Sequence, residues 1–317
     1  MKVLVTGAAG FIGSHLAERL SGQGHDVFGL DCFTDHYSRV LKELNAEEVK
    51  NKGVELLELD LAEDDLTDAV RDVEIIYHCA AQPGICAETP YEKYVRNNIT
   101  ATYRLLDAVK GSASLKFFVN VSTSSVYGRD ATDTEEAPPK PTSYYGVTKL
   151  AAEQLVLSYN REVGFPACSL RLFSVYGPRE RPEKLYPLLI RSILEGTEFG
   201  LFKGSENHKR SFTYVADVID GFVAVLENTD KCFGQIINIG LDQERSTADG
   251  IKIVEEILSK KARCVTVPKR TGDQLRTCAN ITKARELLGY APKRTLMEGL
   301  EAEVGWYREK VFGKVDY

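Results

Sequence analysis

The stretch that decides the fold is T-G-A-A-G-F-I-G-S-H, which runs from Thr6 to His15. It follows residues 2–5, a run rich in valine and leucine that predicts a buried strand. Three glycines spaced three apart lead into apolar residues with helical spacing, and Gly22 ends the predicted helix. Such a turn lets the backbone approach a pyrophosphate, which the free N–H groups and the dipole at a helix N-terminus attract.

The residues after this turn decide between dinucleotide binding and an ordinary turn. Residues 26–30 predict a second apolar strand, which ends on Asp31, 18 residues after Gly13. A carboxylate there can accept both hydroxyls of an adenine ribose and repels a 2′-phosphate, so it favours NAD over NADP. Asp31 can also be a simple strand-end residue, but strand, glycines, helix, strand and acid in this order predict a dinucleotide site.

The composition is that of a globular enzyme. The chain has 317 residues, 43% of them apolar and 27% charged, and a net charge of −6. A negative net charge does not predict binding to nucleic acid or to an anionic membrane. No apolar run approaches the ~20 residues of a membrane helix. The seven cysteines are scattered without a C-x-x-C pair, which predicts no metal site and a cytoplasmic location. The chain starts directly in the first strand, so we expect no signal peptide.

Strands alternate with helices along the first half of the chain, which predicts a Rossmann-type doubly wound α/β fold with a parallel sheet. Further strands are expected at residues 54–61, 74–79, 115–121 and 167–173, and a long helix at 91–109. The later pattern is looser, with short strands at 199–202, 210–214 and 234–239 and helices at 187–195, 216–226, 247–260, 282–288 and 296–310. We therefore expect an NAD-binding domain at residues 1–170 and a smaller, interleaved α/β substrate domain at residues 171–317.

Polar residues follow several predicted strands. Asp60 ends the third strand, where it can bond an adenine amino group or simply end the strand. His78 lies inside an apolar strand and is interpreted as a packed core histidine. The strand at 115–121 leads into S-T-S-S-V-Y-G at Ser122–Gly128. Because ligands bind at the carboxyl ends of strands in open parallel sheets, we expect this cluster to face the cofactor.

A second pattern supplies acid–base chemistry. Tyr145 and Lys149 are four residues apart, so they share one face of a predicted helix. We expect the ammonium of Lys149 and the positive nicotinamide to lower the pKa of the phenol toward neutrality, which makes Tyr145 a general acid or base. Thr123 is placed to hold the substrate oxygen. The pair alone occurs by chance on many helices, so this interpretation depends on the dinucleotide motif upstream.

The helix that carries this pair is apolar on more than one face. Residues 147–159 include Val147, Leu150, Leu155, Val156 and Tyr159. One face must cover the sheet, and the other predicts a partner helix from a second copy of the chain. We therefore expect a homodimer.

The chain resembles the extended short-chain dehydrogenase/reductases, in the branch of nucleotide-sugar epimerases and dehydratases. The motifs that carry the resemblance span the chain and are T-G-A-A-G-F-I-G, H-C-A-A-Q, S-T-S-S-V-Y-G, Y-G-V-T-K, L-F-S-V-Y-G-P-R, R-S-F-T-Y-V-A-D and R-T-G-D. The resemblance implies Thr123, Tyr145 and Lys149 as the catalytic residues. It implies that NAD is held by Gly7, Gly10, Phe11, Ile12, Gly13, Asp31, Asp60, Leu61, Ala80, Asn98, Ser122, Tyr145, Lys149 and Phe173. It implies that the nucleoside diphosphate is held by Lys184, Leu185, Phe202, Arg210, Arg270 and Asp273.

The residues after Thr123 separate the reactions of this branch. The related 4,6-dehydratases have an Asp-Glu pair there and the UDP-glucuronate decarboxylases a glutamate, whereas this chain has Ser124 and Ser125. Serines cannot act as acids near neutral pH, so we expect a UDP-sugar 4-epimerase that inverts the 4-hydroxyl through a 4-keto sugar. A dehydratase, a decarboxylase, another oxidoreductase and a non-catalytic NAD-binding regulator remain as alternatives.

The sugar is less clearly indicated than the reaction. The resemblance places the small residue Thr277 where a bulky one excludes a 2-acetamido group, which allows N-acetylhexosamines. Ser174 and Arg181, together with Thr123, Ser124 and Ser125, resemble the carboxylate-binding pattern of UDP-glucuronate 4-epimerases, although Arg181 can also be a solvated surface charge. UDP-glucose, UDP-N-acetylglucosamine and UDP-glucuronate therefore all remain open as substrates.

Overall fold

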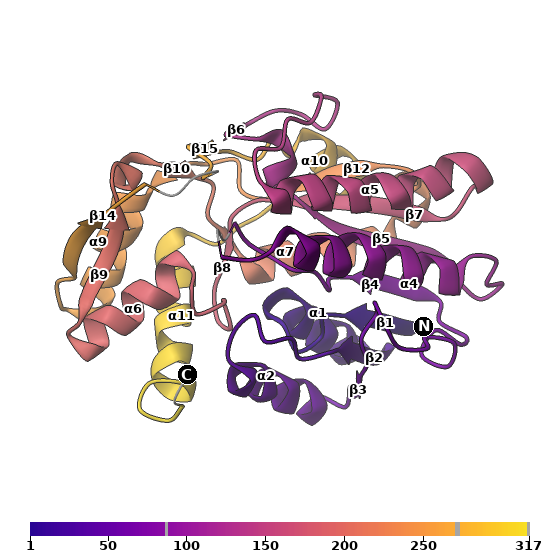
Figure 1. Ribbon diagram of the computed structural model, residues 1–317, viewed down its shortest axis with the longest axis horizontal. Helices are drawn as coiled ribbons and strands as arrows, with labels where there is room; N and C mark the ends of the chain where they lie inside the picture. The colour runs from indigo at the N-terminus through magenta and orange to yellow at the C-terminus, as the bar shows by residue number, and fades with distance from the viewer. Residues whose placement is uncertain (86–87, 270–272, 316–317) are drawn as a thin grey trace.

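A seven-stranded parallel sheet forms the largest layer of the computed structural model, which describes residues 1–85, 88–269 and 273–315 (Figure 1). The strand order is β12-β7-β5-β4-β1-β2-β3. The strands are β1 (Lys2–Thr6), β2 (Asp26–Asp31), β3 (Glu55–Glu58), β4 (Ile75–His78), β5 (Phe117–Thr123), β7 (Ala167–Leu172) and β12 (Ile236–Ile239). The order reverses between β1 and β4, where doubly wound sheets form their ligand crevice. The predicted Rossmann-type fold is confirmed.

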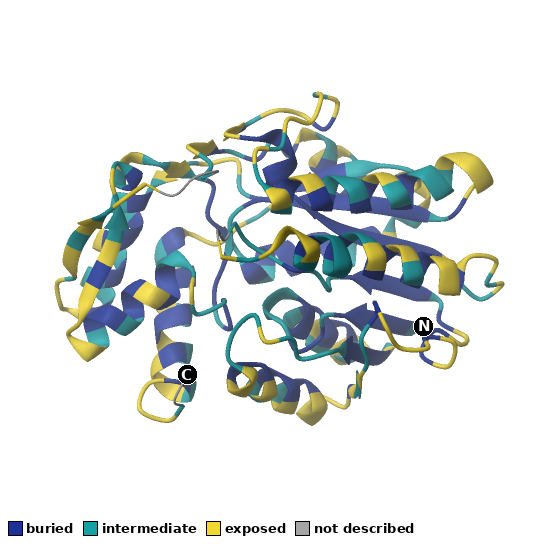
Figure 2. Ribbon diagram, in the orientation of Figure 1, coloured by how far each residue is buried: buried dark blue, intermediate teal, exposed yellow. Residues whose placement is uncertain are grey.

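Successive residues of each strand face opposite sides of the sheet and build two cores. Val3 and Val5 pack in one core, while Leu4 between them packs in the other. The first core includes residues of α1 and α7 and the second includes residues of α4 and α5, so the sheet is covered on both faces (Figure 2). The helices against the sheet are α1 (Phe11–Gly22), α2 (Arg39–Asn51), α4 (Ala101–Val109), α5 (Tyr144–Val163), α7 (Val215–Glu227) and α10 (Thr282–Leu288).

A third core lies in the other lobe of the molecule, at the left of Figure 1. Its buried residues include Tyr186, Val254 and Leu300, which come from three helices. The elements of this lobe are α6 (Leu185–Glu195), α9 (Thr247–Leu258), α11 (Leu296–Lys310) and the parallel pair β9 (Glu198–Phe202) and β14 (Arg263–Val267). Within the described ranges, no helix combines the length and apolar character needed to cross a membrane.

The remaining elements are short. The strands are β6 (Asp130–Ala131), β8 (Val175–Tyr176), β10 (Lys209–Arg210), β11 (Thr213–Tyr214), β13 (Arg245–Ser246) and β15 (Arg276–Thr277), which form a small sheet β13-β10-β15-β6 and a pair β11-β8. The short helices are η2 (Ser124–Tyr127), η3 (Ser205–Asn207) and α8 (Thr229–Cys232). The predicted domain boundary between residues 170 and 171 falls inside β7, and β12 and α10 return to the large sheet from beyond it. The division into two domains stays a prediction.

Two elements differ from the sequence expectation. Strand β3 is shorter than the expected strand at 54–61, since the Asp60 carboxylate accepts from the Ala62 N–H at 2.8 Å and the Asp60 N–H donates to Asp64 at 2.7 Å. These bonds turn the chain away from the sheet edge. The expected helix at 91–109 is divided into α3 (Tyr91–Tyr94), a π-helical segment η1 (Val95–Thr100) and α4.

The strands expected at 199–202 and 210–214 do not form one unit. Strand β9 pairs with β14, a strand at residues 263–267 that the sequence pattern did not predict. Residues 210–214 divide into β10 and β11, which belong to different sheets. Each of these pairings joins residues far apart in the chain, so local periodicity does not report it.

Candidate active site

One cavity of about 840 Å³ runs from the glycine turn after β1 to the lobe that contains α6 and β9. It opens at the carboxyl ends of β1, β2, β4, β5 and β7, where the doubly wound fold places ligands. Most of the predicted site residues line it. They are Gly7, Gly10, Phe11, Ile12, Gly13, Asp31, Asp60, Leu61, Ala80, Ser122, Thr123, Ser124, Ser125, Tyr145, Lys149, Ser174, Arg181, Lys184, Leu185, Phe202, Arg210 and Asp273.

The glycine turn brings backbone segments into close approach. A Cβ atom on Gly7 would lie 2.9 Å from the Ala80 nitrogen, and one on Gly13 would lie 2.2 Å from the Gly7 oxygen. Helix α1 then begins after Gly10 without a side-chain cap and without acidic residues in its first turn. The first N–H groups of a helix lack partners within it, so this end of α1 suits a pyrophosphate at the cavity wall.

Asp31 at the end of β2 is held by two backbone groups. Its carboxylate accepts from the Phe33 N–H at 2.8 Å and from the Ala9 N–H at 3.1 Å. Burial raises the pKa of Asp31, and these two hydrogen bonds act in the opposite direction. A carboxylate can accept about four hydrogen bonds, so capacity remains for ribose hydroxyls. The uncapped helix and this carboxylate fit the two ends of an adenosine diphosphate moiety of NAD.

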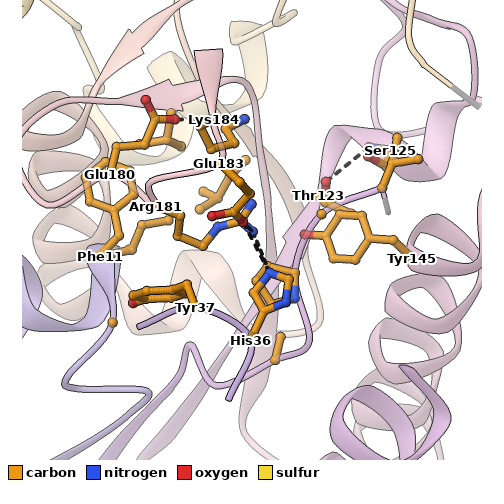
Figure 3. Close-up of a pocket in the computed structure, with 18 of the residues that line it drawn as sticks. Phe11, His36, Tyr37, Thr123, Ser125, Tyr145, Glu180, Arg181, Glu183 and Lys184 are labelled. Carbon is orange, nitrogen blue, oxygen red and sulfur yellow. Dashed lines mark hydrogen bonds and ion pairs between the residues drawn. The ribbon is translucent and has the colours of Figure 1, made fainter. Parts of the chain in front are cut away.

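Thr123, Tyr145 and Lys149 all line the cavity. Thr123 is the last residue of β5 and its hydroxyl accepts from the Ser125 N–H at 3.2 Å. Helix α5 places Tyr145 in its first turn, and Ser143 caps that turn by accepting from the Gly146 N–H at 3.1 Å. The Thr123 hydroxyl lies beside the Tyr145 phenol (Figure 3). Thr123 and Tyr145 therefore meet between the sheet and the helix, and Lys149 follows one turn later on α5.

The electrostatics of this group correct one expectation. Burial raises the pKa of Tyr145, and the influences that act against burial are the hydrogen bond to Thr123 and the charge of Arg181 rather than Lys149. Burial also lowers the pKa of Lys149 to about 8, although Cys79 and Glu153 act to raise it. The prediction that Lys149 lowers the pKa of Tyr145 is thus wrong for the protein alone. These influences on the pKa of Tyr145 come from the protein only and do not include the positive nicotinamide, which the same prediction invoked.

His78 is a structural residue, as predicted. Its side chain is fully buried, with Nδ1 2.9 Å from the Thr6 hydroxyl and Nε2 2.9 Å from the Thr102 hydroxyl. Burial lowers the pKa of His78 to about 3, and the charge of Lys149 acts in the same direction. The ring is therefore neutral at physiological pH.

Three predicted site residues lie behind the cavity wall rather than on it: Asn98, Phe173 and Thr277. Asn98 accepts from the Gln82 N–H at 2.7 Å and donates to the Thr148 hydroxyl at 2.9 Å, because η1 packs it against α5. Thr277 is fully buried and lies 3.1 Å from the Ser174 hydroxyl. Their roles in ligand binding stay predictions, and Arg270 lies outside the described residues.

The charged residues at the distal end of the cavity are paired within the protein. Arg210 lies 3.6 Å from the Asp273 carboxylate and donates to the Gln274 carbonyl. The Gln274 amide in turn donates to the Gly128 carbonyl at 2.9 Å. At the proximal end, Arg96 lies 2.7 Å from the Asp60 carboxylate. A bond from Asp60 to the adenine amino group stays a prediction.

The structure adds cavity residues that sequence reasoning missed, among them His36, Gln274 and Glu183. His36 follows the second strand in a polar stretch without periodicity, and its partners lie 46 and 145 residues away. Its only sequence signal is its position five residues after Asp31. In the part of the chain that the structure describes, no group of three or more histidine, cysteine, aspartate or glutamate residues is arranged to hold a metal ion.

The profile of the NAD dependent epimerase/dehydratase family matches residues 3–240. The chain belongs to this family, and its cofactor is NAD. A UDP-glucose epimerase of Bacillus subtilis, YtcB, described as uncharacterized, is 37% identical over 311 residues, which cover 96% of this chain and 98% of that protein. UDP-glucuronate 4-epimerase 2 of Arabidopsis thaliana is 34% identical over 97% of this chain and 76% of its own length.

A solved structure resembles the whole chain. The UDP-glucuronic acid 4-epimerase of Bacillus cereus, crystallised with UDP-glucuronic acid and NAD, superposes with a TM-score of 0.93 and is 39% identical. The similarity covers 98% of this chain and 99% of that one. The resemblance to nucleotide-sugar epimerases is thereby confirmed at the level of sequence and fold.

Proposed function

We propose that this NAD-dependent UDP-sugar 4-epimerase acts on UDP-glucuronate. The observation that carries the proposal is the position of Arg181, which lines the same cavity as Tyr145 and whose charge acts to lower the pKa of the phenol. In a uronate the carboxylate is attached to C5, the neighbour of the carbon that is inverted. A cation close to the acid–base tyrosine can therefore bind that carboxylate while Tyr145 faces the 4-hydroxyl.

The hydroxyl groups around Arg181 support the same substrate. Thr123, Ser124 and Ser125 are buried at the end of β5 and line the cavity, as does Ser174. Hydroxyls and a guanidinium together can satisfy a carboxylate, and arginine is well suited to bind it with two parallel hydrogen bonds. The similarity to the Bacillus cereus and Arabidopsis thaliana enzymes supports the same assignment.

The chemistry assigns one role to each catalytic residue. Tyr145 removes the proton of the 4-hydroxyl and returns it at the end, with Thr123 holding the substrate oxygen. Lys149, which lies one helical turn from Tyr145, supplies a donor in the same buried region. When NAD is bound, it supplies the reversible two-electron oxidation that produces the 4-keto sugar. Lys184, Arg210 and Arg270 are proposed to hold the diphosphate while the sugar turns.

The other reactions of the family need groups that are absent from these positions. A dehydratase moves protons at neighbouring sugar carbons, and Ser124 and Ser125 have no acidic group for that purpose. An oxidoreductase releases an oxidised or reduced product and depends on added NAD. These alternatives predict loss of water or carbon dioxide, or net change in NADH absorbance, instead of a 4-epimer.

We also propose a cytoplasmic homodimer. Exposed large apolar side chains lie on α3, α4 and α5, among them Tyr103, Tyr144 and Val147. The rings of Tyr91 and Tyr144 lie 5.1 Å apart on this surface. A second copy packed on these helices would bury it. Light scattering should give a dimer for the protein and a monomer for Val147→Glu, and a monomeric wild type would contradict the proposal.

The substrate is tested by incubating the purified protein with UDP-glucuronate, UDP-glucose or UDP-N-acetylglucosamine without added NAD. Proton NMR of the sugar 4-position should show a 4-epimer that forms fastest from UDP-glucuronate. Tyr145→Phe is the control and should form none. Faster turnover of either neutral sugar would overturn the uronate assignment, and a product other than a 4-epimer would overturn the reaction.

A further inference from the structure

The guanidinium of Arg181 is held by groups from both lobes of the protein. Its Nη1 donates to the Glu183 carboxylate and lies 2.9 Å from His36 Nε2, and His36 Nε2 lies 3.2 Å from Glu183 Oε1 (Figure 3). Glu183 follows Arg181 by two residues, whereas His36 comes from the loop between β2 and α2. The His36 side chain is 11% exposed. A buried imidazole and a carboxylate therefore meet the same guanidinium nitrogen.

The hydrogen-bond partners assign the protons of His36. Arg181 Nη1 lies 2.9 Å from His36 Nε2 and can only donate, so Nε2 accepts. In the neutral ring the proton is then on Nδ1, 2.9 Å from the Gln82 side-chain amide, whose otherwise unpartnered oxygen can accept it when it faces the ring. Contact with His36 and the charge of Arg181 lower the pKa of Glu183 to about 2, although burial acts to raise it. His36 and Glu183 thus both accept from Arg181 Nη1.

Both ends of this chain of hydrogen bonds are anchored. Gln82 is buried, and its backbone N–H and carbonyl are both bonded to the Asn98 side chain. The loop that carries His36 is fixed just before this residue, since Lys42 donates to the Thr34 hydroxyl at 2.9 Å and Lys93 lies 2.5 Å from the Asp35 carboxylate. The position of His36 is therefore determined by the NAD-binding part of the protein.

Backbone packing limits the guanidinium on another side. Gly84 adopts a φ of +83°, and a Cβ built on it would lie 3.2 Å from Arg181 Nη1. The Gly84 carbonyl accepts from the Tyr94 hydroxyl at 2.8 Å, which fixes this segment. Arg181 has five donors, and those not directed at Glu183 or His36 are available to a ligand.

We propose that His36 and Glu183 are positioning residues that hold Arg181 for the carboxylate of the substrate, and so determine selectivity for uronates. This inference rests on the proposed function, because it needs a substrate that has a carboxylate. Without the two residues, a long arginine side chain has several rotamers open to it, and ordering it on binding costs affinity. The loss concerns only ligands that Arg181 contacts.

The test compares binding of UDP-glucuronate with binding of UDP, which has no sugar. Calorimetry on the NAD-loaded protein in a Tyr145→Phe background measures both without turnover. His36→Ala should weaken binding of UDP-glucuronate about tenfold and change binding of UDP by less than about twofold. His36→Gln should recover most of the loss, because its amide oxygen can accept from Arg181. His25→Ala, the same substitution at a histidine outside the cavity, is the matched control.

Kinetics of the variants with an intact Tyr145 provide the second readout. His36→Ala should raise KM for UDP-glucuronate about tenfold with kcat within about twofold. Glu183→Ala should act in the same direction, and Glu183→Gln should retain most of the affinity because its amide oxygen still accepts. Tighter binding of UDP-glucuronate by both Glu183 variants would overturn the proposal, since it would identify Glu183 as a competitor for Arg181.

The outcomes separate this inference from the proposed function. If the wild type binds UDP-glucuronate no better than UDP-glucose, the proposed substrate is wrong. If the wild type prefers UDP-glucuronate and His36→Ala keeps that preference, only the positioning role is wrong. Equal weakening of UDP and UDP-glucuronate in His36→Ala would also overturn it, because that pattern indicates a general structural defect.

Discussion

Lys149 should make the protein less stable at neutral pH than an apolar residue at the same position would. Its side chain is buried on α5, and burial lowers its pKa from 10.5 to about 8. In the unfolded chain the pKa returns to its usual value. Each pH unit between the two values corresponds to about 1.4 kcal/mol, so holding the charged lysine costs about 3 kcal/mol at pH 7.

The pH dependence of this cost has a definite sign. Below pH 8 the lysine is charged in both states, and the full cost applies. Between pH 8 and pH 10.5 the folded state releases its proton while the unfolded state keeps it, so the free energy of unfolding of the wild type rises with pH. Lys149→Met has no such proton. The amount by which the free energy of unfolding of Lys149→Met exceeds that of the wild type should be greatest at pH 7 and decline toward zero near pH 10.5.

Urea unfolding from pH 7 to pH 10, after removal of bound nucleotide, measures the effect. We expect Lys149→Met to be inactive and about 3 kcal/mol more stable at pH 7, as happens where a catalytic group is buried at the expense of stability. Lys252→Met, on the exposed side of α9, is the control and should change the free energy of unfolding by less than about 0.5 kcal/mol. A Lys149→Met protein no more stable than the wild type, or a gain that does not decline with pH, would refute this reasoning.

Three further substitutions test the structural account. Glu153→Gln leaves the buried guanidinium of Arg171 without its carboxylate at 2.6 Å, so urea unfolding should show a loss of about 3–5 kcal/mol; a loss below 1 kcal/mol would show that the pair is dispensable. Gly13→Ala places a Cβ 2.2 Å from the Gly7 oxygen, so the purified protein should melt at a lower temperature and retain less NAD, and unchanged NAD content would contradict the packing argument. Asp31→Ser removes the carboxylate at the end of β2, so the ratio of NADP to NAD dissociation constants should fall about tenfold or more, and an unchanged ratio would exclude that residue as the selector.

Local patterns predicted the parts of the fold that depend on local physics. The valine- and leucine-rich strands and the glycine turn predicted the Rossmann-type sheet, because burial on both faces leaves continuous apolar runs. The spacing of Tyr145 and Lys149 predicted that they share a helix face, which α5 confirms. The pairing of β9 with β14 was not predictable in this way, since it joins strands about sixty residues apart.

The electrostatics of the site needed the three-dimensional structure. Spacing alone suggested that Lys149 lowers the pKa of Tyr145, but burial is the larger influence on both groups and depends on the whole surrounding core. The contact of His36 with Arg181 spans 145 residues of sequence and has no periodic signal. The motifs therefore indicated which residues belong to the site. The residues that position them, such as His36 beside Arg181, could be identified only from the three-dimensional structure.

The central claim is that the protein inverts C4 of a UDP-sugar without releasing the hydrogen that leaves this carbon. The most direct test uses UDP-glucuronate labelled with deuterium at C4, incubated with the purified protein and no added NAD. The account predicts a 4-epimer that retains the deuterium at C4, because oxidation and reduction take place on one bound cofactor. Loss of deuterium from C4, or its appearance in released NADH, would contradict the account.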